Sequence, residues 1–175
     1  MEFVHSIDDL LSSEECEYYI DMFSDKSKVE DINDRHRKYH RVQFKDSDLA
    51  DKLYNHIKKY LPKKILKIAD GMNDHIRLSM YEPGQFFGIH KDGINFDKLD
   101  KNRMSYATLN IFLNSDFTGG ETTFYEKDSK TIKYVCKPKA GRGAFFYSQQ
   151  YHEGNKILCG YKYLLRTDLM INHNK

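Results

Sequence analysis

The sequence predicts an α+β fold, in which N-terminal helices pack on one outer sheet of a jelly-roll core. Helix signals occur in the first 74 residues, and short strand patterns separated by Gly, Asn, Asp and Lys follow from residue 75. Several of these strands are too apolar to face water on one side, which favours a double-sheet jelly roll or barrel. A chain of 175 residues is long enough for one domain with its own core. We therefore expect a single domain over 1–175, with a helical support region at 1–74 and the catalytic jelly-roll core at 75–175.

The first helix is predicted to begin after Ser12. Ser12 and Glu15 have the spacing of a capping box, in which the N-cap hydroxyl and the carboxylate three residues later each bind a backbone N–H of the first turn. The apolar and aromatic run that follows predicts a helix that ends near Ser24.

A second helix is predicted after Asp46 and Asp48. Its apolar side chains recur at helical spacing: Leu49, Leu53, Ile57 and Leu61. The basic stretch 35–41, with interleaved Tyr and His, precedes this helix. It could form a strand or a loop near the mouth of the barrel, and both a solvated face and a substrate-contacting surface stay open for it.

Six strands are predicted in the second part of the chain. Each is a run of apolar or β-branched residues bounded by turn-forming residues. They are HIRLSMY (75–81), ATLNIFL (107–113), TTFYE (122–126), TIKYVCK (131–137), GAFFYS (143–148) and KYLLRTDLMI (162–171).

The composition favours a soluble cytoplasmic protein and gives little indication of a polyanionic partner. Hydrophobic residues make up 39% and charged residues 31%, and the net charge of +2 makes nucleic acid an unlikely partner. No apolar run approaches a membrane span, and the N-terminus lacks the features of a signal peptide. Three cysteines without a Cys-x-x-Cys pair indicate free thiols in a reducing compartment. We expect a monomer, because no exposed apolar stripe suggests a partner surface.

His90-Lys91-Asp92 is the most informative motif. Alternate residues of an extended segment point the same way, so His90 and Asp92 share one face. A distant His152 would complete two imidazoles and one carboxylate, the arrangement typical of non-haem Fe(II) oxygenases. The spacing alone is weak evidence for a metal site, since a polar strand end and an unrelated histidine with its own hydrogen-bond partners would show the same pattern.

The segments around this motif carry a stronger signal. In chain order they are YEPGQ (81–85), GGETTF (119–124), PKAG (138–141), HEG (152–154) and GYK (160–162). Taken together, they resemble the prolyl 4-hydroxylase-like branch of the Fe(II)- and 2-oxoglutarate-dependent dioxygenases over nearly the whole chain. The resemblance implies a double-stranded β-helix with the metal near its mouth. It also implies that His90, Asp92 and His152 are the metal ligands and the catalytic centre.

Two basic residues compete for the co-substrate. The resemblance implies that Lys162 pairs with the far carboxylate of 2-oxoglutarate and that the hydroxyl of Tyr81 helps to hold it. Arg166 shares a strand face with Lys162, and its planar guanidinium is the better geometric match for a carboxylate. The spacing after His152 favours Lys162. Arg77 lies on the same strand face as Tyr81, where it could contact co-substrate or substrate, or face solvent.

The resemblance implies an enzyme that hydroxylates a C–H bond, above all of a prolyl residue in a peptide or protein, and releases succinate and CO2. Fe(II), 2-oxoglutarate and O2 would be required, with ascorbate as a candidate reductant. Two alternatives remain. One is a non-catalytic jelly-roll binding module, and the other is an oxygenase for a modified nucleobase or a small molecule. Demethylases of nucleic acid place two arginines after the distal histidine, whereas only Arg166 follows His152 here.

Overall fold

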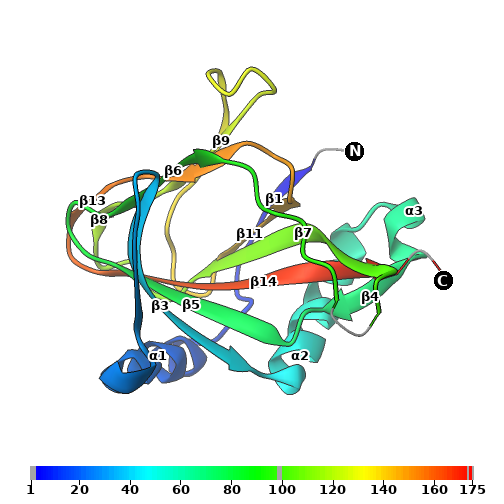
Figure 1. The fold of residues 1–175 in the computed structure, drawn as a ribbon, viewed down its shortest axis with the longest axis horizontal. Coiled ribbons are helices and arrows are strands. Elements are labelled where there is room, and N and C mark those ends of the chain that lie inside the picture. The colour runs from blue at the N-terminus through cyan, green and yellow to red at the C-terminus, as the bar shows by residue number, and fades with distance from the viewer. Residues whose placement is uncertain (1–2, 98–99, 173, 175) are drawn as a thin grey trace.

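The computed structural model describes residues 3–97, 100–172 and 174 (Figure 1). The first helix, α1 (Ser13–Asp21), begins at the predicted capping box. The backbone N–H of Glu15 donates to the Ser12 hydroxyl at 3.2 Å, and the backbone N–H of Ser12 donates to the Glu15 carboxylate at 2.8 Å. A 3-10 turn at Met22–Ser24 continues the helix to its predicted end. A second such turn lies at Lys26–Lys28.

Helix α2 (Ser47–Ile57) is capped by Asp46, whose carboxylate accepts a hydrogen bond from the backbone N–H of Leu49 at 2.8 Å. The predicted apolar stripe is buried, although Leu61 lies beyond a 3-10 turn at Lys58–Tyr60. The four-residue helix α3 (Lys63–Leu66) follows Pro62. No helix among the described residues is long and apolar enough to cross a bilayer.

Most strands join into one antiparallel sheet that folds round into a barrel (Figure 1). Its strands, in spatial order, are β1 (Val4–Ile7), β11 (Gly143–Tyr147), β7 (Arg103–Phe112), β14 (Lys162–Asn172), β5 (His75–Tyr81), β3 (Arg37–Lys45), β6 (Phe86–His90), β12 (His152–Gly154), β9 (Thr122–Tyr125) and β10 (Ile132–Cys136). Strand β2 (Glu30–Asn33) pairs with β3, and β4 (Ala69–Met72) pairs with β14. A separate pair consists of β8 (Thr118–Gly119) and β13 (Ile157–Cys159).

The predicted fold class is confirmed, and all six predicted strands are present. Residues 1–74 contain strands β1 to β4 in addition to the helices, so this region is only partly the helical support that the sequence suggested. The sequence left the basic stretch 35–41 open between a strand and a loop. Residues 37–41 lie in strand β3, so most of this stretch is a strand. Its inward positions are polar, so no apolar period marked it.

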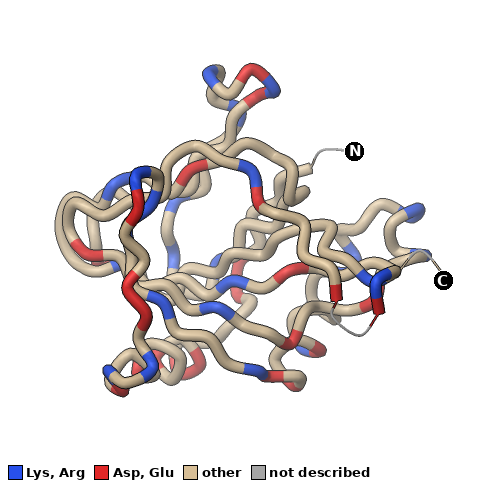
Figure 2. Tube along the Cα trace, in the orientation of Figure 1, with Lys and Arg blue, Asp and Glu red and all other residues tan. Residues whose placement is uncertain are grey.

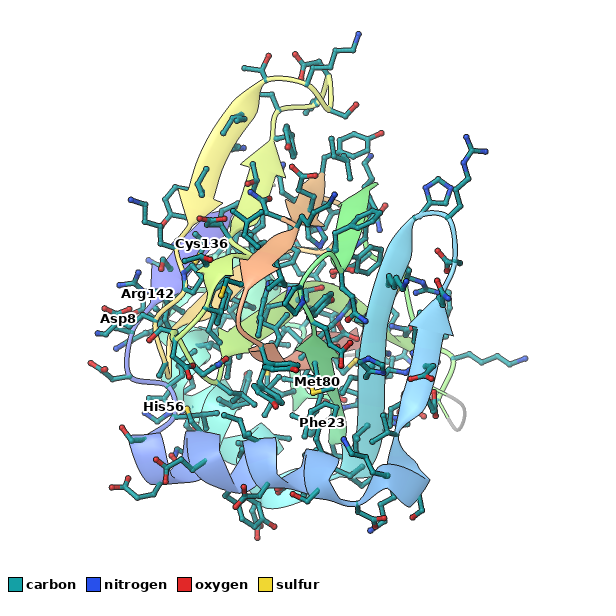
Figure 3. The ribbon with its side chains drawn as sticks, turned by 90° about the vertical axis from the view of Figure 1, so that its left-hand side faces the viewer. Asp8, Phe23, His56, Met80, Cys136 and Arg142 are labelled. Carbon is teal, nitrogen blue, oxygen red and sulfur yellow. The ribbon has the colours of Figure 1, made fainter. Side chains whose placement is uncertain are left out.

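The sheet has an outer apolar face that packs on the helices. On β5, Ile76, Leu78 and Met80 belong to the main core together with Leu53 and Ile57 of α2. Figure 3 shows Phe23 and Met80 close to the level of helix α1, where the helical layer meets the sheet. Because alternate residues of a strand point to opposite faces, the remaining positions of β5 must face the inside of the barrel.

The inner face of the barrel carries both apolar and polar side chains. A second core cluster there consists of Phe112, Phe124, Cys136, Ala144, Phe146 and Leu164. The other inward positions of β3, β5 and β14 are polar or charged and line a cavity. The fold therefore places its unusual residues, buried cations and carboxylates, around one interior space.

Candidate metal centre and its pocket

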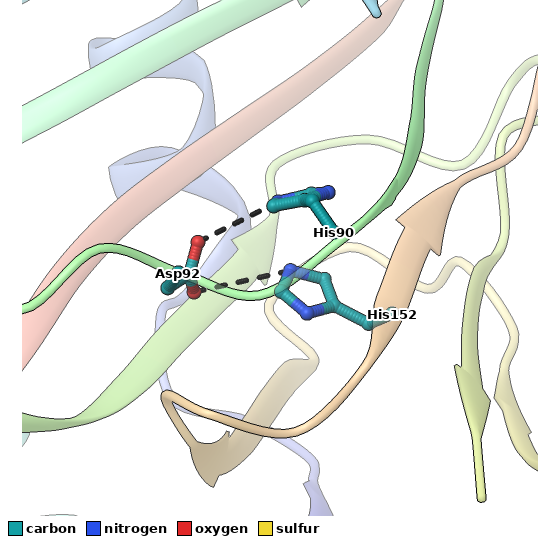
Figure 4. Close-up of side chains that lie close together, drawn as sticks. All are labelled: His90, Asp92 and His152. Carbon is teal, nitrogen blue, oxygen red and sulfur yellow. Dashed lines mark ion pairs between the residues drawn. The ribbon is translucent and has the colours of Figure 1, made fainter. Parts of the chain in front are cut away.

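Three candidate metal-ligating side chains meet at the junction of two paired strands. His90 ends β6 and His152 begins β12, and the two residues face each other in the strand register. Asp92 follows His90 by two residues. The candidate ligand atoms all lie within 4.8 Å of one another. Nε2 of His90 is 3.6 Å from Oδ1 of Asp92, and Nε2 of His152 is 3.8 Å from Oδ2 (Figure 4).

Both imidazoles are oriented by backbone carbonyls. Nδ1 of His90 lies 2.7 Å from the carbonyl oxygen of Gly88, and Nδ1 of His152 lies 3.0 Å from that of Gln150. A carbonyl only accepts, so Nδ1 carries the proton in each ring and Nε2 presents a lone pair. Burial lowers the pKa of His152 to about 4, so this ring is neutral at pH 7.

Asp92 is buried, and its carboxylate is held by an ion pair and a hydrogen bond. Arg166 Nη1 lies 2.7 Å from its Oδ1, and the hydroxyl of Thr108 donates to its Oδ2 at 2.6 Å. Burial alone would raise the pKa of Asp92, but Arg166, His152 and the hydrogen bonds hold that pKa well below its usual range. The carboxylate is therefore ionised before any metal binds.

This donor set fits a divalent first-row metal ion. Two imidazole nitrogens and one carboxylate oxygen are the ligands that Fe(II) accepts in oxygenases, and the cavity beside them leaves room for further ligands. Nε2 of His90 is buried and has no hydrogen-bond partner among the described residues. An orphaned lone pair costs free energy in the interior, and a metal ion would satisfy it.

The cavity next to the three residues has a volume of about 240 Å³. Lys162, Tyr81 and Arg166 all line it, as the sequence suggested for co-substrate residues. The Lys162 side chain is 1% exposed, and its ammonium donates to the carbonyl of Gly120 at 2.7 Å. The ammonium also lies 5.2 Å from the ring centroid of Tyr81. It forms no ion pair with a carboxylate in the described part of the chain, and burial lowers the pKa of Lys162 to about 8.

The family whose sequence pattern matches the chain is described as the 2OG-Fe(II) oxygenase superfamily, and the match covers residues 76–167, slightly more than half of the chain. The chain belongs to this superfamily. A search of curated protein sequences found no match.

Solved structures place the fold of this oxygenase beside that of prolyl hydroxylases. The viral collagen prolyl hydroxylase of Paramecium bursaria Chlorella virus-1, in complex with 2OG, has a TM-score of 0.71 at 23% identity, over 97% of this chain and 96% of the viral chain. A Pseudomonas putida prolyl-4-hydroxylase has a TM-score of 0.71 at 12% identity, over 97% and 92% of the two chains. A Trichoplax adhaerens prolyl hydroxylase, bound to a hypoxia-inducible-factor peptide, has a TM-score of 0.74 at 13% identity, over 98% and 84%.

Arg166 and Lys162 differ in what already surrounds them in this oxygenase. Besides its contact with Asp92, Arg166 Nη2 lies 3.4 Å from Oδ1 of Asp168. The guanidinium of Arg166 therefore forms ion pairs with two buried carboxylates. The ammonium of Lys162 instead contacts the carbonyl of Gly120 and the rings of Tyr81 and Phe112. Tyr81 stacks on Tyr39 with ring centroids 5.1 Å apart. Burial raises the pKa of Tyr81, which keeps its hydroxyl protonated as a hydrogen-bond donor.

Sequence reasoning missed the roles of three residues that contact side chains of the oxygenase pocket from outside its lining. Thr108 binds Asp92, and Asp168 binds Arg166, but neither belongs to a recognisable motif. Asp168 could have been found, since it follows Arg166 by two residues and shares its strand face. Gly120, which lies in the GGETTF segment, has φ of +70° and supplies the carbonyl that binds Lys162.

Proposed function

We propose that the chain is an Fe(II)- and 2-oxoglutarate-dependent dioxygenase that hydroxylates a prolyl residue of a peptide or protein. One observation carries the proposal. A buried lysine without a carboxylate partner among the described residues lines the same cavity as the His90, Asp92 and His152 group. A buried ammonium of this kind is costly unless a ligand supplies the opposite charge.

In this proposal His90, Asp92 and His152 hold Fe(II) through two Nε2 atoms and one carboxylate oxygen. When bound, Fe(II) and 2-oxoglutarate supply the oxidising chemistry, in which O2 is consumed, succinate and CO2 are released, and one oxygen atom enters a C–H bond. Ascorbate as the reductant belongs to the same proposal.

The protein contributes position, charge and exclusion of water. Lys162 binds the far carboxylate of 2-oxoglutarate, and the protonated hydroxyl of Tyr81 donates to it. Arg166 keeps Asp92 ionised and oriented. Phe87 stacks on His90 with ring centroids 3.6 Å apart, which shields one side of the centre from solvent.

Support for a prolyl substrate comes from the fold. Its neighbours include prolyl hydroxylases, one of them with a peptide bound. Since one fold hosts several chemistries, the substrate needs its own test. The three free cysteines, Cys16, Cys136 and Cys159, support the reducing cytoplasm as the compartment.

An anaerobic titration of the purified apoprotein tests the cofactor site. Fe(II) is added first and 2-oxoglutarate second, and the visible charge-transfer band of the chelate is recorded. We expect a band that needs both additions, that is lost in His152→Ala, and that persists in His56→Ala. His56 is a matched control because it is an exposed histidine of α2 whose Nδ1 lies 3.0 Å from the backbone carbonyl oxygen of Lys52.

Absence of the band in the folded wild-type protein would favour the non-catalytic binding module instead. A band without turnover would retain the cofactor site and reject the prolyl substrate. Turnover is measured by mass spectrometry, as the addition of one oxygen atom to a proline-containing peptide together with formation of succinate.

A further inference from the structure

Arg77 stands on the cavity wall beside the candidate metal centre. In the sheet register it lies opposite Arg166 of β14 on one side and opposite Gln43 of β3 on the other. Directly paired residues on one face of a sheet have Cβ atoms about 5 Å apart, so the two arginine side chains start as neighbours. The Arg77 side chain is 26% exposed and lines the cavity. It can therefore reach a ligand that Arg166, fixed on Asp92, cannot.

The charge of Arg77 is poorly compensated. Asp168 is its ion-pair partner, with Arg77 Nη2 3.8 Å from Oδ2. That carboxylate already binds the guanidinium of Arg166 and the side-chain amide of Asn95, at 3.4 and 3.3 Å. Burial and the adjacent Arg166 lower the pKa of Arg77, which reflects the same shortage of negative charge. Among the described residues, Arg77 shares a carboxylate that others hold more closely.

The other two arginines of the cavity wall have carboxylates of their own. Arg37 lies 2.9 Å from Asp34, and Arg41 lies 2.7 Å from Glu30. Arg37 and Arg41 each have a close carboxylate partner, whereas Arg77 does not. Of these three arginines, Arg77 is therefore the one best placed to bind a further anion.

The proposed cofactors do not correct the imbalance, because the two positive charges of Fe(II) and the two negative charges of 2-oxoglutarate cancel. Among the described residues, Asp92 lines the cavity, and the buried Asp168 contacts Arg77 and Arg166 from outside the cavity lining. These two carboxylates are set against the three charges of Lys162, Arg166 and Arg77. One positive charge therefore remains in excess, apart from the exposed Lys91. A buried excess charge is stabilised by a partner of opposite sign.

We propose that Arg77 binds a carboxylate of the substrate, so that the preferred substrate is acidic close to the C–H bond that reacts. The inference rests on the proposed function and names its substrate class. The carboxylate could be the side chain of an acidic residue beside the proline or that of a small free acid. A polyanion fits less well, because the excess is a single charge and because Glu30, Asp31 and Asp34 lie among the basic residues of the hairpin formed by β2 and β3 (Figure 2).

Calorimetric titration with two matched pairs of probes tests this assignment. The protein is loaded with 2-oxoglutarate and Mn(II) under anaerobic conditions, since the proposed reaction consumes O2. The first pair is acetyl-Asp-Pro-Gly-amide and acetyl-Asn-Pro-Gly-amide, and the second is N-acetylproline and N-acetylprolinamide. Each pair differs by one negative charge, and the pair that shows the preference identifies the source of the carboxylate.

We expect the acidic member of one pair to bind about tenfold to hundredfold more tightly than its neutral partner, the range of a charge-assisted hydrogen bond. Arg77→Gln should remove this preference, and Arg77→Lys should keep part of it. Arg142→Gln should retain it, because Arg142 lies outside the cavity and pairs with Asp8 at 2.6 Å (Figure 3).

Equal wild-type binding within both pairs would overturn the proposal, and so would an unchanged preference in Arg77→Gln. If Arg77→Gln does not fold, the wild-type comparison still decides. Failure of the proposed function is distinct, since it appears as a missing Fe(II)–2-oxoglutarate band in the wild-type protein before any probe is added.

Discussion

Replacing Lys162 with methionine should weaken 2-oxoglutarate binding without destabilising the apoprotein. Burial lowers the pKa of Lys162 from its ordinary 10.5 to about 8. This difference corresponds to about 3 kcal/mol of stability that the apoprotein lacks while the ammonium is charged. Methionine has a similar length and no charge, so it removes the cost. It also leaves the carbonyl of Gly120 without its donor, which costs about 1–3 kcal/mol. The net result at pH 7 is a variant between equally stable and about 2 kcal/mol more stable.

The pH dependence makes the prediction sharper. Below pH 8 Lys162 is charged in both the folded and the unfolded state, and the whole cost applies. Between pH 8 and 10.5 the unfolded chain keeps its proton longer than the folded protein, so the free energy of unfolding rises with pH. Above that range the cost is gone. Lys162→Met should lack this rise.

Urea denaturation of the apoprotein at several pH values between 7 and 10.5 measures the effect. Lys64→Met is the matched control, since Lys64 is exposed on α3 and should keep the wild-type pH profile. In the anaerobic titration, the dissociation constant of 2-oxoglutarate should increase at least about tenfold in Lys162→Met. A variant destabilised by more than about 2 kcal/mol at pH 7, with unchanged 2-oxoglutarate affinity, would falsify the view that this ammonium, which has no carboxylate partner among the described residues, gains one from the co-substrate.

Three further substitutions test the supports of the pocket and the core. Gly120→Ala adds a Cβ at a φ of +70° that would overlap the side chain of Ile157, so the 2-oxoglutarate affinity in the same titration should fall while Fe(II) binding persists. Leu53→Ala, at a fully buried site between α2 and the sheet, should lower the free energy of unfolding in urea by about 2–5 kcal/mol. Ser12→Ala removes half of the capping box and should cost about 1 kcal/mol in the same assay.

The fold was predictable where local patterns decide it. The capping box at Ser12 and the stripe of α2 follow from the period of the helix, and strand β5 matches its predicted range of residues 75–81. The sequence left residues 35–41 open between a strand and a loop, because the inward residues of β3 include arginine and tyrosine facing a polar cavity, so apolar alternation is absent. Short strands such as β6 and β12 are formed mainly by tertiary pairing, which no local period indicates.

The sequence predicted which residues belong to the site better than it predicted the contacts between them. His90 and Asp92 are two residues apart, and their spacing alone places both on one face. The spacing after His152 favoured Lys162 over Arg166 for the co-substrate but did not exclude Arg166, because both side chains point inward from one strand. The separating fact is the 2.7 Å contact between Arg166 and Asp92, which joins residues far apart in the sequence. Only a register across several strands brings such a pair together.

The contact between Arg166 and Asp92 gives Arg166 and Lys162 different electrostatic roles. Arg166 compensates Asp92, a charge the fold already contains, and so the metal-binding half of the cavity is held in shape before any ligand arrives. Lys162 is buried without a carboxylate in the described residues, so the other half reaches charge balance only when an anion enters. Arginine suits the first role because its fixed fork can bind Asp92 and Asp168 together. Under the proposed function lysine suits the second role, because one compact ammonium on a flexible stem could exchange the Gly120 carbonyl for a carboxylate of the co-substrate.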